Sequence, residues 1–218
     1  MSILDNVIDA KAYVGTLKRY SNPKTEKYWL NVQNWVVVIN PETVVAQLEA
    51  AKTRIAELKK EWKQILVICE KSFYREEIEQ LGTEAGVHYL NYKIPGWVLT
   101  NFDTLLSRIR SMNELKKHIE SEDFQRLTKK EKLVKIRQYQ KLEVVYKWVK
   151  NLKNKPDFVI IIDWKFMSKF VDEVEKTKID NLVLATTNFD RRWKDENIVM
   201  MNMSSYGAMD FAVKYILK

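Results

Sequence analysis

Two short apolar runs flank an amphipathic segment in the first third of the chain. Val36–Ile39 is wholly apolar, and the Asn40 and Pro41 that follow are typical of a helix N-cap and first helical residue. Apolar residues then recur at largely helical spacing up to position 62, before the apolar run Ile65–Ile68. The pattern predicts a strand, a helix and a second strand.

The same alternation continues along the chain and returns in its last third. A helix is expected at about 74–85, ended by Gly86 and followed by a short strand at 87–90. The last third contains further apolar runs and one more amphipathic segment, which predict strands at 158–162, 182–185 and 198–201 and a helix at about 165–176. Together these elements predict an α/β fold, a parallel sheet with helices on both faces.

A different pattern lies between the two groups. Apolar residues step by three and four from Leu105 to Ile119, with charged or polar residues between them. Thr128 and Glu131 form a capping box, after which similar spacing continues to Leu152. We therefore expect an antiparallel helical hairpin, or coiled coil, inserted into the sheet domain. The expected boundaries are 102–152 for the hairpin, and 1–101, including a basic N-terminal extension, with 153–218 for the sheet domain.

Net charge favours a polyanionic partner. The 218 residues include 37 Lys and Arg against 29 Asp and Glu, a formal charge of +8, which is typical of RNA-binding proteins but also of basic proteins from AT-rich genomes. No apolar run approaches the roughly 20 residues of a membrane span. The acidic first residues resemble neither a secretory signal nor a transit peptide. We expect a cytoplasmic protein with no membrane partner.

Familiar catalytic and cofactor motifs are missing from the sequence. The turn after Val36–Ile39 lacks the glycines of a dinucleotide-binding fingerprint. His88, His118 and the single Cys69 are too few for a familiar zinc site. Asp163 and Asp190 follow predicted strands, where α/β enzymes bind ligands, but no nucleophile with a neighbouring base accompanies them. We expect no catalytic residue, no metal and no cofactor.

Several motifs, in matching order, are similar to those of one protein family. Residues 95–102, Pro-Gly-Trp-Val-Leu-Thr-Asn-Phe, resemble the G-G-x-L-T-N-F segment of the small-subunit ribosomal protein S2 family of bacterial type. Residues 18–24 resemble its R-R-W-N-P-K segment, and residues 127–131 its L-T-K-K-E helix start. Residues 186–190 are similar to its D-T-N-x-D. One departure is Tyr-Val-Gly-Thr at 13–16, where the family has H-F-G-H.

The resemblance implies a flavodoxin-like sheet domain with a protruding coiled coil and no enzymatic activity. It also implies binding to small-subunit rRNA between the head and body of the ribosomal subunit. The neighbouring partners would be other small-subunit ribosomal proteins, including small-subunit protein one. The RNA-binding residues expected on this basis lie in three predicted loops and are Lys18, Arg19, Lys24, Lys93, Thr100, Asn101, Arg191 and Arg192.

Alternatives to this interpretation stay open at the level of sequence. Any one of these cations could be a solvated surface residue, and Thr100 and Asn101 could instead cap the following helix. The chain could be a non-ribosomal scaffold that docks proteins on its hairpin, or a flavodoxin-like enzyme that binds a flavin or nucleotide. An organellar ribosome is an alternative location.

Glycine and tryptophan occur in unusual numbers. The chain has 5 glycines and 7 tryptophans, whereas roughly 7% glycine is usual. Tryptophan stands where the resembled family has glycine at 35, 97, 148 and 193, and position 62 is a fifth candidate. Because glycine positions in turns often need a positive φ, we hypothesise that a UGA codon read as glycine in the source has been translated here as tryptophan.

Overall fold

The protein is described by a computed structural model. The residues described are 2–92, 94, 96, 98–149, 152, 154–191 and 193–218, with the backbone alone for Trp148. Lys93, Pro95, Trp97 and Arg192, which figure in the expectations above, lie outside this set.

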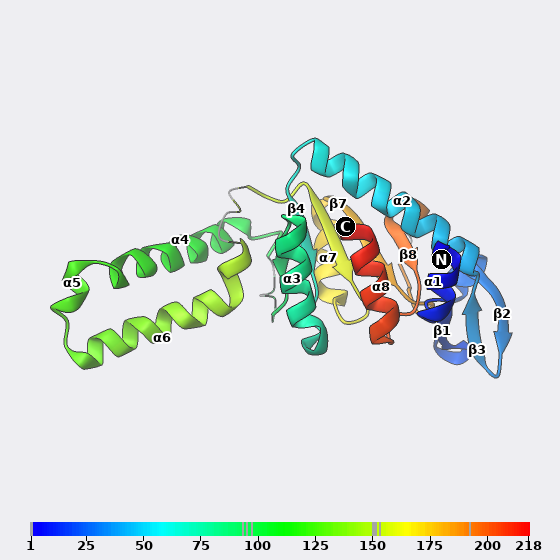
Figure 1. Ribbon diagram of the computed structural model, residues 1–218, viewed down its shortest axis with the longest axis horizontal. Coiled ribbons are helices and arrows are strands. Elements are labelled where there is room, and N and C mark those ends of the chain that lie inside the picture. Colours follow the sequence, from blue (N-terminus) through cyan, green and yellow to red (C-terminus); the bar gives the residue numbers. More distant parts are fainter. Residues whose placement is uncertain are drawn as a thin grey trace.

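A five-stranded parallel sheet forms the centre of the larger domain (Figure 1). In order across the sheet its strands are β5 (His88–Leu90), β4 (Ile65–Ile68), β6 (Phe158–Ile162), β7 (Asp180–Ala185) and β8 (Ile198–Met200). Along the chain, β4 is the first strand of this sheet. β5 then joins it on one side, and β6, β7 and β8 follow on the other side. This order is that of flavodoxin-like folds, with a switch point between β4 and β6.

Helices cover both faces of this sheet. On one face α2 (Pro41–Lys60), α3 (Arg75–Ala85) and α8 (Tyr206–Leu217) pack together, with the short α1 (Ile3–Asp9) against α2 and α8. The connection from β4 to β5 contains α3, and the connection from β6 to β7 contains α7 (Ser168–Thr177). The two connections run in opposite directions across the sheet, so right-handed crossovers place α3 and α7 on opposite faces. The predicted parallel sheet with helices on both faces is confirmed. Single turns η3 (Ser72–Tyr74) and η5 (Asp195–Asn197) complete the connections.

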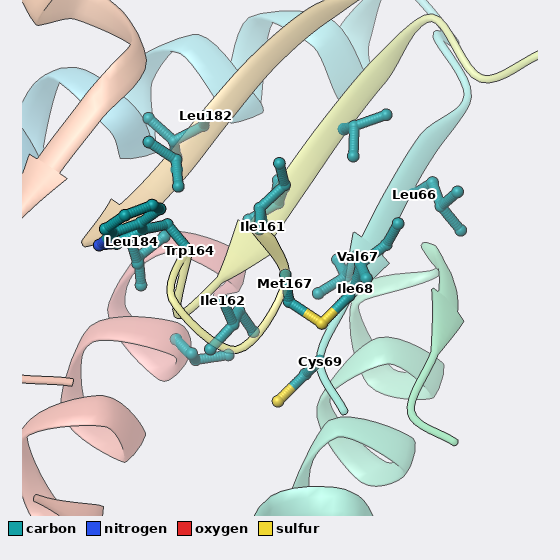
Figure 2. Packing of buried hydrophobic residues seen from close by; sticks show 14 of the residues in the cluster. Leu66, Val67, Ile68, Cys69, Ile161, Ile162, Trp164, Met167, Leu182 and Leu184 are labelled. Carbon is teal, nitrogen blue, oxygen red and sulfur yellow. The ribbon is translucent and has the colours of Figure 1, made fainter. Parts of the chain in front are cut away.

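The core lies on both sides of the central strands. All five residues of β6 are buried, as are all four of β4. Figure 2 shows β4, β6 and β7 side chains meeting Trp164 and Met167 beyond the end of β6. Cys69 is buried in this cluster, and burial raises the pKa of its thiol to about 11, so the thiol is the protonated, unreactive form at neutral pH.

A second, smaller sheet precedes the first. It is antiparallel, in the order β1 (Val14–Leu17), β3 (Val36–Ile39), β2 (Trp29–Gln33), with η1 (Lys18–Tyr20) and η2 (Pro23–Tyr28) between β1 and β2. The strand prediction for Val36–Ile39 is therefore confirmed, but its expected place in the parallel sheet is wrong. The reason is the tight turn before it, which folds β3 back on β2.

The hairpin extends away from the sheet domain, on the side opposite β1–β3 (Figure 1). Its arms are α4 (Phe102–Ile119) and α6 (Lys129–Tyr146), which pack on each other, with α5 (Glu122–Gln125) at the tip. The capping box of Thr128 and Glu131 is present. The second helix ends earlier than the spacing predicted, because after the turn η4 (Lys147–Val149) the side chains of Val149 and Leu152 are buried in the main core.

Two tryptophans adopt backbone conformations that favour glycine. Trp35 has φ +64° and, with Asn34 at φ +47°, forms the two-residue turn between β2 and β3. Positive φ at both central residues is the property of a type I′ turn, for which Asn-Gly is the preferred pair. The Trp35 side chain is 79% exposed. A tryptophan here adds backbone strain with little packing in return.

Trp62 follows α2 in the geometry of a Schellman motif. Its N–H donates to the Lys59 carbonyl at 3.2 Å, and the Lys63 N–H donates to the Leu58 carbonyl at 3.0 Å. Gly86 makes the equivalent pair of bonds at the end of α3, with φ +68° against +58° for Trp62. Trp62 is 92% exposed. Trp193, in contrast, has no positive φ, and its indole donates to Glu175 at 2.7 Å.

The positive φ of Trp35 and Trp62 should lower the stability of the protein. Trp35→Gly and Trp62→Gly should each raise the free energy of unfolding by about 1 kcal/mol, because the left-handed conformation costs a non-glycine residue roughly that amount. Urea denaturation measures the change. Gly86→Ala is the reciprocal control: nothing lies within 4 Å of an added Cβ, so its expected loss comes from the backbone alone. A loss of stability in the two tryptophan variants would contradict the prediction.

Candidate nucleic-acid interface

Two loops far apart in sequence meet at the edge of the sheet domain. The basic loop, residues 18–24, lies against the late loop, residues 186–191, which follows β7. The Asn22 N–H donates to the Thr187 carbonyl at 2.8 Å, and the Lys24 ammonium donates to the Asp190 carbonyl at 2.7 Å. The two loops that sequence motifs singled out are thus one surface.

Hydroxyl groups hold these loops together. The Thr187 hydroxyl, which accepts from the Thr16 N–H at 2.8 Å, lies 2.8 Å from the Thr16 hydroxyl and 3.0 Å from the Ser21 hydroxyl. Thr187 is fully buried. A Cβ at Gly15 would lie 2.8 Å from the Thr187 methyl carbon, so only glycine allows β1 to approach this closely. The interlocking contacts give the basic loop a defined backbone.

Four side chains of the basic loop are accessible to solvent. Lys18, Arg19, Tyr20 and Lys24 are all exposed. The Arg19 guanidinium lies over the Tyr20 ring, 4.6 Å from its centroid. Among the residues that the structure describes, no carboxylate pairs with Lys18 or Arg19. Their charges are available to a polyanion.

Other cations nearby are already neutralised. The Arg191 guanidinium contacts Asp172, Glu175 and Asp190. Lys27 pairs with Asp195, and the hydrogen bond between them lowers the pKa of Asp195 and raises that of Lys27. Arg191, although singled out with the basic loop, lies in an acidic environment that competes with phosphate for its guanidinium.

The remaining candidates lie elsewhere. Asn101 occupies the N-cap position of α4, but its side-chain oxygen accepts from the Thr104 hydroxyl at 2.8 Å rather than from a backbone N–H. Thr100 and Asn101 are both exposed, and Asn101 lines a cavity of about 240 Å³ at the base of the hairpin. Figure 1 places the start of α4 and the β1–β3 sheet at opposite ends of the sheet domain. The expected set is therefore split between two surfaces.

A buried ion pair lies at the switch point between β4 and β6. The Lys71 ammonium lies 2.6 Å from the Asp163 carboxylate and also donates to the Met203 carbonyl. The side chains are only 8% and 13% exposed. Asp163 has φ +64°, and its other oxygen accepts from the Lys165 N–H. Where flavodoxin-like enzymes hold a ligand, this chain has an internal ion pair.

Metal and membrane sites were also sought in the described residues. That part of the chain contains no cluster of three or more His, Cys, Asp or Glu side chains arranged to hold a metal ion. No helix among the described residues has both the length and the apolarity needed to cross a bilayer.

Tyr20 and the hydroxyls of Thr16, Ser21 and Thr187 were not among the expected site residues. Tyr20 and Ser21 belong to the resembled segment 18–24, Thr187 belongs to the segment 186–190, and Thr16 ends the divergent segment 13–16. Net charge indicates lysine and arginine as RNA-binding residues and gives no information on neutral side chains. The contact between the hydroxyls of Ser21 and Thr187, which are 166 positions apart, becomes visible only in the folded chain.

Comparison with known proteins agrees with this fold. The chain is a basic α/β structural protein with a protruding helical hairpin. The sequence model of the family "Ribosomal protein S2" matches residues 7–218, and the chain belongs to this family. The family is structural, not enzymatic, which removes the enzyme alternative.

Individual relatives match over most of their length. The small ribosomal subunit protein uS2 of Saccharophagus degradans is 29% identical over 185 residues, covering 85% of this chain and 75% of the relative. The protein of the same name from Wigglesworthia glossinidia brevipalpis is 28% identical over 214 residues, covering 98% and 88%. That of Coprothermobacter proteolyticus is 29% identical over 187 residues, covering 86% and 70%.

The buried ion pair leads to a prediction about stability. Lys71→Met leaves the Asp163 carboxylate buried without its counter-charge and should lower the free energy of unfolding by about 3 kcal/mol. Adding Asp163→Asn removes the unpaired charge and should recover part of that loss. Urea denaturation of the single and double variants measures both effects.

The matched control is the more exposed pair of Lys214 and Asp210, whose side chains are 47% and 18% exposed and lie 2.7 Å apart within α8. Lys214→Met should lower stability by less than Lys71→Met does, because solvent screens charges that water can reach. An equal loss in Lys71→Met and Lys214→Met would show that burial of the first pair has no energetic consequence.

Proposed function

We propose that this chain is a structural constituent of the small ribosomal subunit that binds small-subunit rRNA through its basic loop. Family membership and the names of the bacterial relatives support the ribosomal role. The observation that carries the RNA contact is the rigid basic loop, whose Lys18 and Arg19 are exposed without a carboxylate partner in the described structure. Phosphate contacts of this kind position a protein on folded RNA.

The finer placement follows the same proposal. The protein lies between the head and body of the subunit, beside other small-subunit proteins that include small-subunit protein one. The bacterial relatives favour a ribosome in the cytoplasm over one in an organelle. Lys93 and Arg192 belong to the proposed RNA-binding set, as do Lys24, Thr100, Asn101 and Arg191, although Arg191 contributes less because three carboxylates contact it.

Salt dependence of RNA binding tests the basic loop. The double variant Lys18→Gln, Arg19→Gln should bind protein-free small-subunit rRNA more weakly. Its slope of log affinity against log salt should fall by about 2, roughly one per lost phosphate contact. Filter binding at several salt concentrations measures both values.

A second pair of exposed lysines provides the control. Lys60 and Lys63 lie at the end of α2 and are both exposed. The variant Lys60→Gln, Lys63→Gln has the same net charge as the basic-loop variant and should bind as the unaltered protein does. Equal losses in both variants would mean that net charge, and not this surface, carries the binding.

Sedimentation of a cell lysate tests the ribosomal assignment itself. The chain should remain in the small-subunit fraction after a moderate-salt wash, which removes loosely held basic proteins. A free pool at the top of the gradient would favour the scaffold alternative.

A further inference from the structure

Tyr20 is an exposed aromatic side chain on a rigid part of the backbone. It is 61% exposed, although tyrosine usually covers its ring. Its neighbours in the turn, Lys18 and Arg19, are exposed as well. An aromatic ring presented to solvent next to Lys18 and Arg19 needs an explanation beyond packing.

The turn that carries Tyr20 is fixed at both ends. The Lys18 N–H donates to the Trp35 carbonyl at 2.8 Å, and the Ser21 N–H donates to the Leu17 carbonyl at 3.1 Å. The Ser21 hydroxyl joins the buried group around Thr187. Because the backbone is already ordered, a ligand that contacts the ring loses little of its binding energy to ordering of the loop.

The charge around the ring selects the kind of ligand. The Arg19 guanidinium lies 4.6 Å from the ring centroid, and the described structure provides no carboxylate partner for it. A flat ring with a cation stacked on it and further cations beside it suits a nucleobase with its phosphates. A protein partner with an apolar surface would leave these charges without partners, which is costly when they are desolvated.

We propose that Tyr20 stacks on an unpaired base of the bound RNA, while Arg19 and Lys18 contact the adjoining phosphates. The inference rests on the proposed function, since it names the part of the RNA that this surface binds. Single-stranded loops and bulges present such unstacked bases, and stacking on an aromatic ring is tolerant of base identity. Tyr20 therefore contributes affinity that does not depend on charge.

The test separates stacking from charge. Purified full-length protein is titrated with protein-free small-subunit rRNA at several salt concentrations. Tyr20→Leu should weaken binding about 10-fold, a typical loss for one stacked base, with an unchanged salt slope. Tyr20→Phe keeps the ring and should bind as the unaltered protein does. Because the side chain is exposed, neither change should alter the urea midpoint.

Tyr206 serves as the matched control. It is a 45% exposed tyrosine whose hydroxyl donates to Glu77, away from the basic loop. Tyr206→Leu should leave RNA binding unchanged. If Tyr20→Leu binds normally while the Lys18 and Arg19 variant loses affinity, stacking is wrong and the proposed function stands. If the unaltered protein does not bind this RNA, both are wrong.

A separate observation concerns Trp35 and Trp62. Within the part of the chain that the structure describes, four other non-glycine residues have positive φ: Asn34 and Asp163 have short polar side chains that tolerate it, and Lys11 and Lys178 have unbranched ones. The two tryptophans are the bulky members of this group. Each occupies a turn in which glycine is the preferred residue, a type I′ hairpin and a Schellman motif.

We infer that both positions are glycine in the protein made by its source cells, which requires that the UGA codon is read there as glycine. The coincidence of two turns that favour glycine, two largely exposed tryptophans and a glycine-poor composition carries this inference. It does not depend on the proposed function.

Peptide mass spectrometry of the protein isolated from its source tests the assignment. Peptides spanning residues 35 and 62 should have the masses of the glycine forms. Tryptophan at either position would overturn the inference for that position and leave genuine sequence divergence as the explanation.

Discussion

The buried contact of Thr187 with the N-terminal extension is the interaction on which the basic surface depends. Its carbonyl accepts from the Asn22 N–H and the Thr25 hydroxyl, and its own hydroxyl meets those of Thr16 and Ser21. Buried polar groups must be paired, so this set restricts the loop to arrangements that satisfy all of them. The parallel sheet thereby determines where the cations of an antiparallel extension point.

A buried ion pair lies at the end of the sheet where similar folds bind small ligands. The carboxyl ends of β4 and β6 are occupied by Lys71 and Asp163, whose charges satisfy each other. The RNA contact proposed above uses a different surface, the basic loop. Fold alone does not reveal this difference, because it depends on which side chains fill the crevice.

Local environment, more than residue type, distinguishes the cations. Lys18 and Arg19 form no ion pair with a carboxylate in the described structure, whereas Arg191 contacts three carboxylates from α7 and its own loop. The desolvation and pairing of a cation decide how much it gains from a phosphate. The two kinds of basic residue look alike in sequence. They differ in whether nearby carboxylates already neutralise their positive charge.

The sequence by itself determined the elements whose signals are local. Apolar runs predicted the strands of the parallel sheet, helical spacing and the capping box predicted both arms of the hairpin, and Gly86 marked the end of α3. Tertiary structure alone decided that Val36–Ile39 joins a separate sheet, that α6 ends where Val149 enters the core, and that Arg191 is neutralised. Periodicity and capping act within a few residues, whereas these outcomes depend on side chains brought together from distant parts of the chain by packing of the whole.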